Sequence, residues 1–385
     1  MSISVIELLE HLIECPSVTP KDEGAQEKLA AALENMGMTC HHLPFGEDEE
    51  GRNARVPNLF ARIGSDGPHL CYAGHTDVVP PGPLDQWTYG PYNPHIENGV
   101  LYGRGASDMK GSVAAFAAAL SAYIEEHGAP KGSVSMLITG DEEGPALNGT
   151  IKVLEWMKEH GHIPDVALVG EPSNPDHLGQ EIKIGRRGSL TGRLTVKGKQ
   201  GHVAYPKRAD NPLPRLVQAL AALTLSQMVL DEGSKFFQPS NLELTTIDVG
   251  NTADNVIPES GRAVFNIRFN DNWTGEKLDK HLRTLLDETG IDYDLKTTVG
   301  GESFLTRPGP WTDIVQKAVK DVTGKTPTPS TTGGTSDARF ITNYCPVVEC
   351  GAINATIHQI DENATVEDLE NLTAIYKRIL ELYFA

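Results

Sequence analysis

The sequence contains little cysteine and few aromatic residues. Aromatic residues make up 6% of its 385 residues, and the five cysteines are Cys15, Cys40, Cys71, Cys345 and Cys350. Their number is odd, their spacing is irregular and no Cys-x-x-Cys pair occurs, which argues against a disulfide framework. The pattern predicts buried thiols in a protein from a reducing compartment.

Positive charge is also scarce, because 33 Lys and Arg residues face 52 Asp and Glu residues, giving a net charge of -19. A surface of this charge repels the phosphates of nucleic acids and the head groups of anionic lipids. We therefore expect neither nucleic acid nor a membrane as a partner. An acidic substrate would need a local cluster of Arg, Lys or metal ions.

Long apolar runs are absent as well. No uninterrupted apolar stretch approaches the about 18 residues that suggest a membrane-spanning helix. The first residues carry Glu7, Glu10 and Glu14 among apolar side chains and lack a basic leader, so they do not resemble a signal peptide. The expected location is the cytoplasm.

The chain is long enough for two domains. Short apolar runs predict buried strands, and runs with helical spacing alternate with them. The strands are expected at residues 58–63, 69–73, 134–139, 166–169 and 346–350, and the helices at 5–13, 24–36, 109–127, 311–323 and from 365 onward. This alternation predicts an α/β fold in which helices cover both faces of a mainly parallel sheet.

Residues 188–300 have a different pattern, because apolar and polar residues alternate along four stretches near 190–196, 242–244, 263–269 and 291–295. With a helix after Pro212 and another over 278–286, the order is strand, helix, strand, strand, helix, strand. This order is typical of a ferredoxin-like α+β module with one face of its sheet in water. We expect it to interrupt a first domain formed by residues 1–187 and 301–385.

Five segments contain potential metal ligands, and four of them also contain glycine. They are residues 74–77 (Gly-His-Thr-Asp), 103–108 (Gly-Arg-Gly-Ala-Ser-Asp), 140–144 (Gly-Asp-Glu-Glu-Gly), 170–172 (Gly-Glu-Pro) and 357–362 (Ile-His-Gln-Ile-Asp-Glu). Each follows an expected strand or leads into an expected helix, and the carboxyl ends of parallel strands meet at one edge of a sheet. Imidazole and carboxylate ligands suit zinc, and a carboxylate can bridge two ions.

Each segment alone has a simpler interpretation. His75 alone would be an ordinary surface or core histidine, residues 141–143 a solvated acidic turn, and Asp108 a helix cap. The two glycines at 103 and 105 lack the third glycine of a dinucleotide-binding loop. Their combination favours a two-metal hydrolytic site with one acidic side chain left over for proton transfer.

These segments resemble the zinc aminoacylase and carboxypeptidase family, whose members hold two zinc ions, and the resemblance extends over essentially the whole chain. It implies that His75, Asp108 and Glu171 bind one zinc ion and that Asp108, Glu143 and His358 bind the other, with cobalt as a substitute. It further implies that Glu142 is the general base for a zinc-activated water and that Asp77 orients His75. The expected reaction is hydrolysis of the amide bond of an N-acyl amino acid.

Further segments, at 185–189, 198–206, 255–258 and 333–340, narrow the resemblance to members whose substrates carry several carboxylates. Arginine is the residue expected to bind carboxylates, although the pattern around Arg268 is equally consistent with an ordinary solvated surface arginine. The implied substrate contacts are Arg186, Arg187, Ser189, Asn255, Arg268, Gly334 and Thr335, and either or both of the adjacent arginines can fill this role. His202 would stabilise the oxyanion in the site of a partner subunit, which implies a homodimer formed through the inserted domain.

Two other hypotheses remain. The first is another member of the same family, such as an acetylornithine deacetylase, another N-acyl amino-acid hydrolase or a carboxypeptidase. The second is a non-catalytic binding protein that kept the fold. The second requires the loss of a ligand or of the base, and every such position is filled in this sequence.

Overall fold

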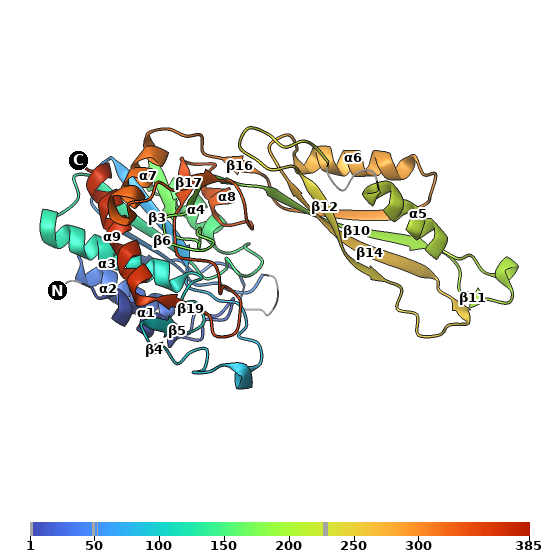
Figure 1. Cartoon of the computed structure of the whole chain (residues 1–385), viewed down its shortest axis with the longest axis horizontal. Helices are drawn as coiled ribbons and strands as arrows, with labels where there is room; N and C mark the ends of the chain where they lie inside the picture. Colours follow the sequence, from blue (N-terminus) through green and yellow to red (C-terminus); the bar gives the residue numbers. More distant parts are fainter. Residues whose placement is uncertain (1–2, 48–50, 52, 226–229) are drawn as a thin grey trace. The chain divides into compact units, whose positions relative to one another are not determined.

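The computed structural model describes residues 3–47, 51, 53–225 and 230–385 and divides into two compact units (Figure 1). Unit 1 comprises Met1–Ile184, Thr306–Ser330 and Ser336–Ala385, and unit 2 comprises Gly185–Leu305 and Thr331–Thr335. Unit 2 therefore begins earlier and ends later than the module expected at 188–300, and it includes a short segment from further along the chain. Each unit is described by itself below.

Unit 1 is built on a sheet whose strands, in the described part of the chain, follow the order β1-β2-β6-β3-β7-β18-β8-β17. The strands are β1 (Thr39–His42), β2 (Asn58–Ile63), β6 (Ser133–Thr139), β3 (His69–His75), β7 (Val166–Val169), β18 (Val347–Glu349), β8 (Glu181–Lys183) and β17 (Thr328–Ser330). The central strands β6, β3, β7 and β18 are parallel, while β1, β2 and β6 pair antiparallel. Every residue of β3 and β6 is buried, which explains their continuous apolar runs.

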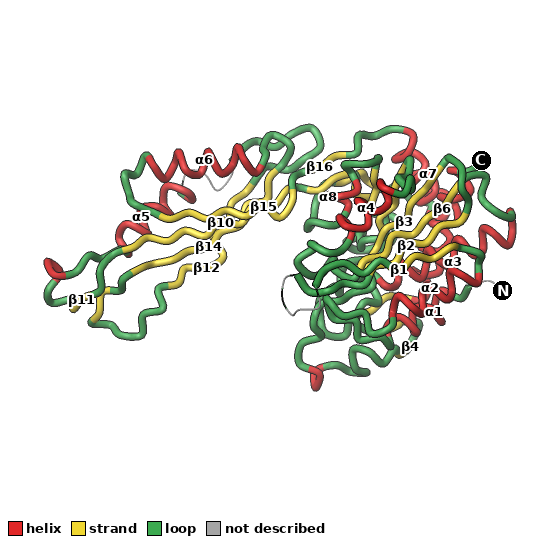
Figure 2. The backbone as a smooth tube through the Cα atoms, turned by 180° about the vertical axis from the view of Figure 1, so that it is seen from behind, coloured by secondary structure: helices red, strands yellow, loops and turns green. Residues whose placement is uncertain are grey.

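Helices cover both faces of this sheet, as the sequence predicts (Figure 2). One face carries α1 (Val5–Ile13), α3 (Lys110–His127), α7 (Pro310–Thr323) and α9 (Val366–Tyr383), and the other carries α4 (Thr150–Glu159) and α8 (Ala338–Ile341). Helix α2 (Ala25–Asn35) contacts α1, β1 and β2. The predicted cap of α9 is present, since the Thr365 side chain accepts a hydrogen bond from the Asp368 amide.

A small antiparallel sheet brings together two segments that are far apart in sequence. It contains β4 (His95–Glu97), β5 (Val100–Tyr102) and β19 (Asn363–Thr365). Asn363 pairs with Tyr102, and the Gly103 amide donates to the Glu362 carbonyl at 2.9 Å. The segment that follows β5 and the segment that precedes β19 are therefore side by side.

Unit 2 has the predicted order of strands and helices. Its antiparallel sheet follows the order β12-β14-β10-β15, with β12 (Asn241–Asp248), β14 (Ser260–Phe269), β10 (Gly188–Lys197) and β15 (Asp294–Gly301). Helices α5 (Leu213–Thr224) and α6 (Gly275–Asp287) pack on one face over a core rich in leucine. Two short pairs, β11 (Gly201–His202) with β13 (Val256–Ile257) and β9 (Gly185–Arg186) with β16 (Phe304–Leu305), complete the unit.

Some sequence expectations were wrong or incomplete. The last strand of unit 2 begins at Asp294, so Ile291 and Tyr293 precede it and pack against the core from a loop. Cys40 is partly exposed, whereas the other four cysteines are buried as expected. Helix α4 and strands β1, β4, β5, β8, β17 and β19 were not predicted, because their sequences are short or only weakly periodic. Among the described helices, none has the length and apolar character needed to cross a bilayer.

Candidate metal centre

Four parallel strands bring the predicted ligand segments to one edge of the sheet. His75 is the last residue of β3, Glu142 and Glu143 follow β6, and Glu171 follows β7. His358 lies in the loop after β18. Because β6, β3, β7 and β18 are neighbours in the sheet and run parallel, their carboxyl ends meet at one place.

Asp108 lies at the centre of this cluster and faces both imidazoles. Its Oδ1 is 3.4 Å from Nε2 of His75, and its Oδ2 is 3.4 Å from Nε2 of His358. It does not cap α3, since the cap position is Met109 and no side chain makes the cap hydrogen bond. One carboxylate therefore presents one oxygen to each of two groups, as a bridging ligand must.

Each group contains the histidine and carboxylate ligands that are typical of a zinc site. The first contains His75, Asp108 and Glu171, and His75 Nε2 is 3.6 Å from Oε1 of Glu171. The second contains Asp108, Glu143 and His358, and His358 Nε2 hydrogen-bonds Oε1 of Glu143 at 2.8 Å. Two ligands that are each about 2.1 Å from one tetrahedral ion lie about 3.4 Å apart. The separations of 3.4 and 3.6 Å therefore fit shared ions.

Two buried polar atoms support the same conclusion. Among the described residues, neither His75 Nε2 nor Asp108 Oδ1 has a hydrogen-bond partner. Buried polar atoms without partners are costly unless something else satisfies them. His75 Nδ1 is bonded to the Asp77 backbone oxygen at 2.8 Å, so the opposite nitrogen points into the cluster. The residues present thus fit a metal ion.

The pKa values of these groups reflect their mutual attraction. Burial by itself lowers the pKa of His75, but the Asp108 and Glu171 carboxylates raise it well above its usual value. Contacts with Asp108 and Glu143 raise the pKa of His358 to about 10. Burial opposes ionisation of Asp108, yet the two imidazoles hold its pKa well below the usual range. A cation bound among these ligands would take the place of the imidazole protons.

Glu142 lies beside both groups without being equivalent to Glu143. Its Oε2 is 4.0 Å from His75 Nε2, and burial together with the Glu171 carboxylate raises its pKa well above the usual value. A carboxylate with a raised pKa accepts a proton readily, as a general base must. Residues 142 and 143 lie in a turn.

Asp77 makes contacts that the sequence did not reveal. The expectation was that its carboxylate orients His75, but the closer contact to that ring comes from the Asp77 backbone oxygen, and the nearest carboxylate oxygen is 3.6 Å away. The carboxylate instead accepts the backbone amides of Glu142 at 3.3 Å and Glu143 at 3.0 Å. Asp77 thus anchors the turn that carries both glutamates.

The predicted substrate contacts all lie in unit 2. Arg268 Nη1 donates to Thr335 Oγ1 at 3.2 Å, and Ser189 pairs with Arg268 across β10 and β14. Arg186 is buried and donates to the Thr332 carbonyl. Arg187 donates to Asn241 Oδ1 at 2.9 Å, and a Cβ added at Gly334, the neighbour of Thr335 in sequence, would meet no atom within 4 Å. Ser189, Arg268 and Thr335 are therefore together on one end of the sheet.

His202 and Asn255 lie elsewhere in unit 2, on the β11–β13 ribbon. The Asn255 carbonyl accepts from the Val203 amide, and His202 pairs with Val256. The Ala204 amide donates to His202 Nδ1 at 3.1 Å. A neutral His202 therefore carries its proton on Nε2, as a hydrogen-bond donor.

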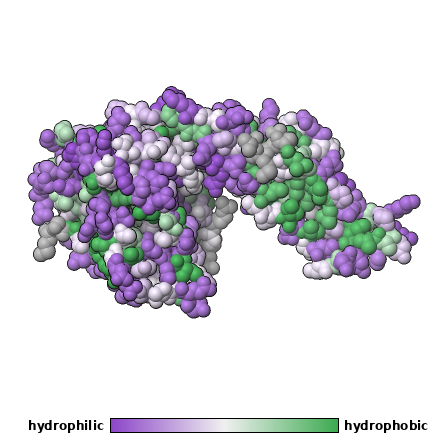
Figure 3. Space-filling view, viewed as in Figure 1, coloured by the Kyte–Doolittle hydropathy of each residue, from purple (hydrophilic) through white to green (hydrophobic). Residues whose placement is uncertain are grey.

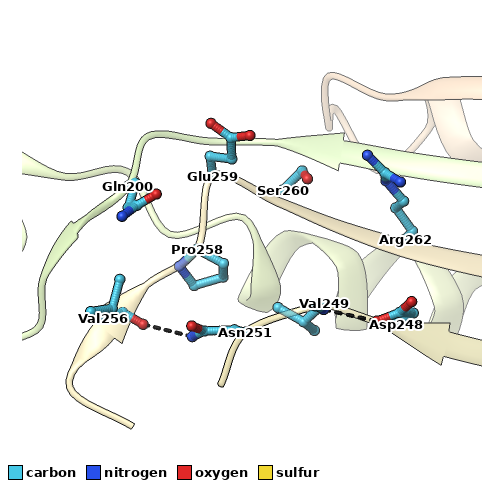
Figure 4. A pocket seen from close by; sticks show the side chains of 10 residues that line it. Gln200, Asp248, Val249, Asn251, Val256, Pro258, Glu259, Ser260 and Arg262 are labelled. Atoms are coloured by element: carbon cyan, nitrogen blue, oxygen red, sulfur yellow. Dashed lines mark hydrogen bonds between the residues drawn. The ribbon is translucent and has the colours of Figure 1, made fainter. Parts of the chain in front are cut away.

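The same unit contains a polar pocket of about 370 Å³ near this ribbon (Figure 4). Its walls include Gln200, Asp248, Asn251, Glu259 and Arg262. Most of these side chains are exposed, and the described residues that line the pocket include none of the predicted site residues. The pocket is therefore distinct from the groups predicted to carry the chemistry.

Two buried charged residues beside the cluster, Arg104 and Glu362, were not singled out from the sequence. Both lie inside segments that were recognised for their ligands, at 103–108 and 357–362. The available signal was a further charged residue inside a segment that already contained a proposed metal ligand.

The chain is similar to known proteins over its whole length. A sequence model of peptidase family M20/M25/M40 matches residues 71–382. A succinyl-diaminopimelate desuccinylase of Rhodospirillum centenum is 56% identical over 385 residues, covering 100% of this chain and 98% of that protein. One of Xanthobacter autotrophicus is 54% identical over 380 residues, covering 98% and 99%.

Solved structures share the fold at low sequence identity. The M20 family metallo-carboxypeptidase Sso-CP2 of Sulfolobus solfataricus has a TM-score of 0.80 at 19% identity and covers 99% of both chains. The YXEP protein of Bacillus subtilis, described as a dinuclear metal-binding peptidase of the M20 family, has a TM-score of 0.72 at 16% identity and covers 98% of this chain and 96% of its own.

Proposed function

The chain belongs to peptidase family M20/M25/M40, and from this premise we propose that it hydrolyses N-succinyl-LL-2,6-diaminopimelate to succinate and LL-2,6-diaminopimelate. The observation that carries the proposal is the 56% identity, over the whole chain, to a protein named for this reaction. The reaction belongs to diaminopimelate and lysine biosynthesis, which agrees with a cytoplasmic enzyme.

The proposed cofactor is a pair of zinc ions, with cobalt as a substitute. His75, Asp108 and Glu171 would hold one ion, and Asp108, Glu143 and His358 the other. When bound, such ions supply Lewis acidity toward the amide carbonyl and toward the attacking water. The arrangement of Asp108, with one oxygen toward each imidazole, supports this assignment.

Glu142 is the proposed general base. Its carboxylate is close to both ligand groups, and its raised pKa suits it to take a proton from water and to deliver that proton to the departing amine. Asp77 holds the Glu142 backbone, so the base is fixed at a definite position in the cluster.

The substrate carries several carboxylates, and we propose that arginines of unit 2 bind them. Arg268 is half-buried beside Thr335 and Ser189, and burial lowers its pKa from the usual value without removing its charge at neutral pH. Burial lowers the pKa of Arg187, and the nearby charge of Arg268 lowers it further. Two neighbouring guanidinium groups form a local positive patch on a chain whose net charge is strongly negative.

We further propose a homodimer formed through unit 2, in which His202 of one chain donates from Nε2 to the oxyanion in the other. Strand β12 lies at an edge of its sheet and exposes Ile247, and α5 exposes Val217. Apolar surface is visible on the face of unit 2 that Figure 3 shows. An apolar helix face and a free strand edge suit association with a second copy. Sedimentation of Val217→Glu tests this: a dimeric parent and a monomeric variant are expected, and a monomeric parent would contradict it.

Turnover of N-succinyl-LL-2,6-diaminopimelate and of N-acetylornithine, measured side by side on zinc-loaded protein, tests the reaction. We expect hydrolysis of the succinylated substrate, with kcat/KM greater than for the acetylated one. A preference for N-acetylornithine would assign the chain to a different branch of the family.

A further inference from the structure

A buried ion pair lies next to the ligand cluster of unit 1. Arg104 Nη1 is 2.7 Å from Oε2 of Glu362, and the two side chains are 2% and 0% exposed. Neither residue belongs to a candidate metal group within the described chain. Because desolvation offsets most of the attraction in a buried ion pair, net stability is a poor explanation for it.

Glu362 uses its second oxygen to hold the backbone at Asp108. Oε1 accepts the amides of Ser107 and Asp108, each at 3.0 Å. Hydrogen bonds to an ionised carboxylate are stronger than those between neutral groups. The backbone of the residue proposed to bridge the two ions is therefore fixed by Glu362.

Arg104 connects the same carboxylate to the loop that carries His358. Its Nη1 also donates to the Gln359 carbonyl at 3.1 Å, immediately after His358. His358 has a φ of 60°, in the left-handed region that non-glycine residues rarely occupy, and its side chain is 48% exposed. Its conformation therefore depends on such anchors, because no helix or strand contains it.

The other ligand group shares Asp108 with this one, but its remaining two ligands do not contact Arg104 or Glu362. His75 is part of β3, where its side chain is 1% exposed, and Glu171 follows the end of β7. The central sheet thus places both of these ligands. Only the second group relies on a loop for its histidine.

We propose that Arg104 and Glu362 are positioning residues that fix His358 relative to Asp108 and thereby set the affinity of the second metal site. The proposal rests on the two-metal site of the proposed function. It assigns a role to residues that bind neither metal nor substrate, and it predicts that the two sites respond unequally to their substitution.

Metal binding to the apoprotein tests this inference. Apoprotein prepared with a chelator is titrated with Zn²⁺ by calorimetry, and Co²⁺ absorption reports the coordination of each equivalent. In Glu362→Gln the amide NH₂ faces Arg104 or the two backbone amides, so one set of contacts is lost. We expect the second equivalent to bind about 10–100-fold more weakly and the first to change less than about threefold.

Three further variants sharpen the test. Glu97→Gln, on the exposed strand β4, is the matched control and should bind both equivalents as the parent does. Arg104→Lys keeps the charge but has fewer donors, and it should weaken the second site less than Glu362→Gln does. If Glu362→Gln fails to fold, Arg104→Gln combined with Glu362→Gln removes both buried charges and carries the test, with the same expected loss at the second site.

The possible outcomes separate the two proposals. A loss of affinity that is greater for the second equivalent than for the first, with an unfolding temperature of the apoprotein close to that of the parent, supports the positioning role. Unchanged affinity of both equivalents, or an equal loss at both, overturns it while the two-metal site stands. A parent that takes up no second equivalent overturns the two-metal site, and the positioning role with it.

Discussion

Replacing Asp77 by asparagine separates two roles for this residue. The Asp77 side chain is 0% exposed, and its two oxygens accept the amides of Glu142 and Glu143. Asparagine supplies one oxygen, so one amide loses a hydrogen bond to a charged group, worth about 1.5–3 kcal/mol. If this free energy is lost from the transition state because Glu142 is held less firmly, kcat falls by about 10–150-fold, at 1.36 kcal/mol for each factor of ten.

The His75 ring should remain in place, because it is bonded to the backbone oxygen of residue 77, which asparagine retains. The assay is therefore kcat on zinc-loaded protein together with the affinity of the first zinc equivalent, and Asp85→Asn on the exposed surface is the control. We expect reduced kcat with an unchanged first equivalent. A normal kcat, or a loss confined to the first equivalent, would refute the reasoning that Asp77 acts by anchoring the turn.

Three other predictions concern single residues. Glu142→Ala should abolish turnover while zinc content stays at the parent level, and near-normal activity would remove its role as the base. His202→Ala should lower kcat strongly without changing zinc content, and an unaffected rate would exclude the oxyanion role. Burial and Arg62 lower the pKa of His69 from 6.5 to about 4, so its contribution to stability is complete above pH 6.5 and is lost as the pH falls toward 4. Urea unfolding should show about 2 kcal/mol of this loss between pH 7 and 5; His69→Gln should lack it, and an equal pH dependence in both proteins would contradict the assignment.

The sequence predicted the fold and the ligand cluster well where local patterns carry the information. The apolar runs of β3 and β6 are fully buried in parallel strands, and the ligand segments follow them, so their meeting at one edge was predictable from topology. The alternating stretch that became β14 likewise has the burial pattern expected of a strand with one face in water.

Other features depend on contacts between residues that are distant in sequence, so local sequence patterns could not predict them. The pairing of β5 with β19 brings Glu362 to Asp108 across more than 250 residues, and neither strand has a marked pattern. The turn at Glu142 and Glu143 is held by the Asp77 carboxylate, which follows the end of a different strand. Cys40 is partly exposed because β1 lies at the edge of the sheet.

Anomalous diffraction at the zinc edge from crystals of the zinc-loaded protein tests the central claim most directly. The account predicts two peaks about 3.5–4 Å apart, one beside His75 and Glu171, the other beside Glu143 and His358, with Asp108 between them. A single peak, or two peaks away from Asp108, would contradict it.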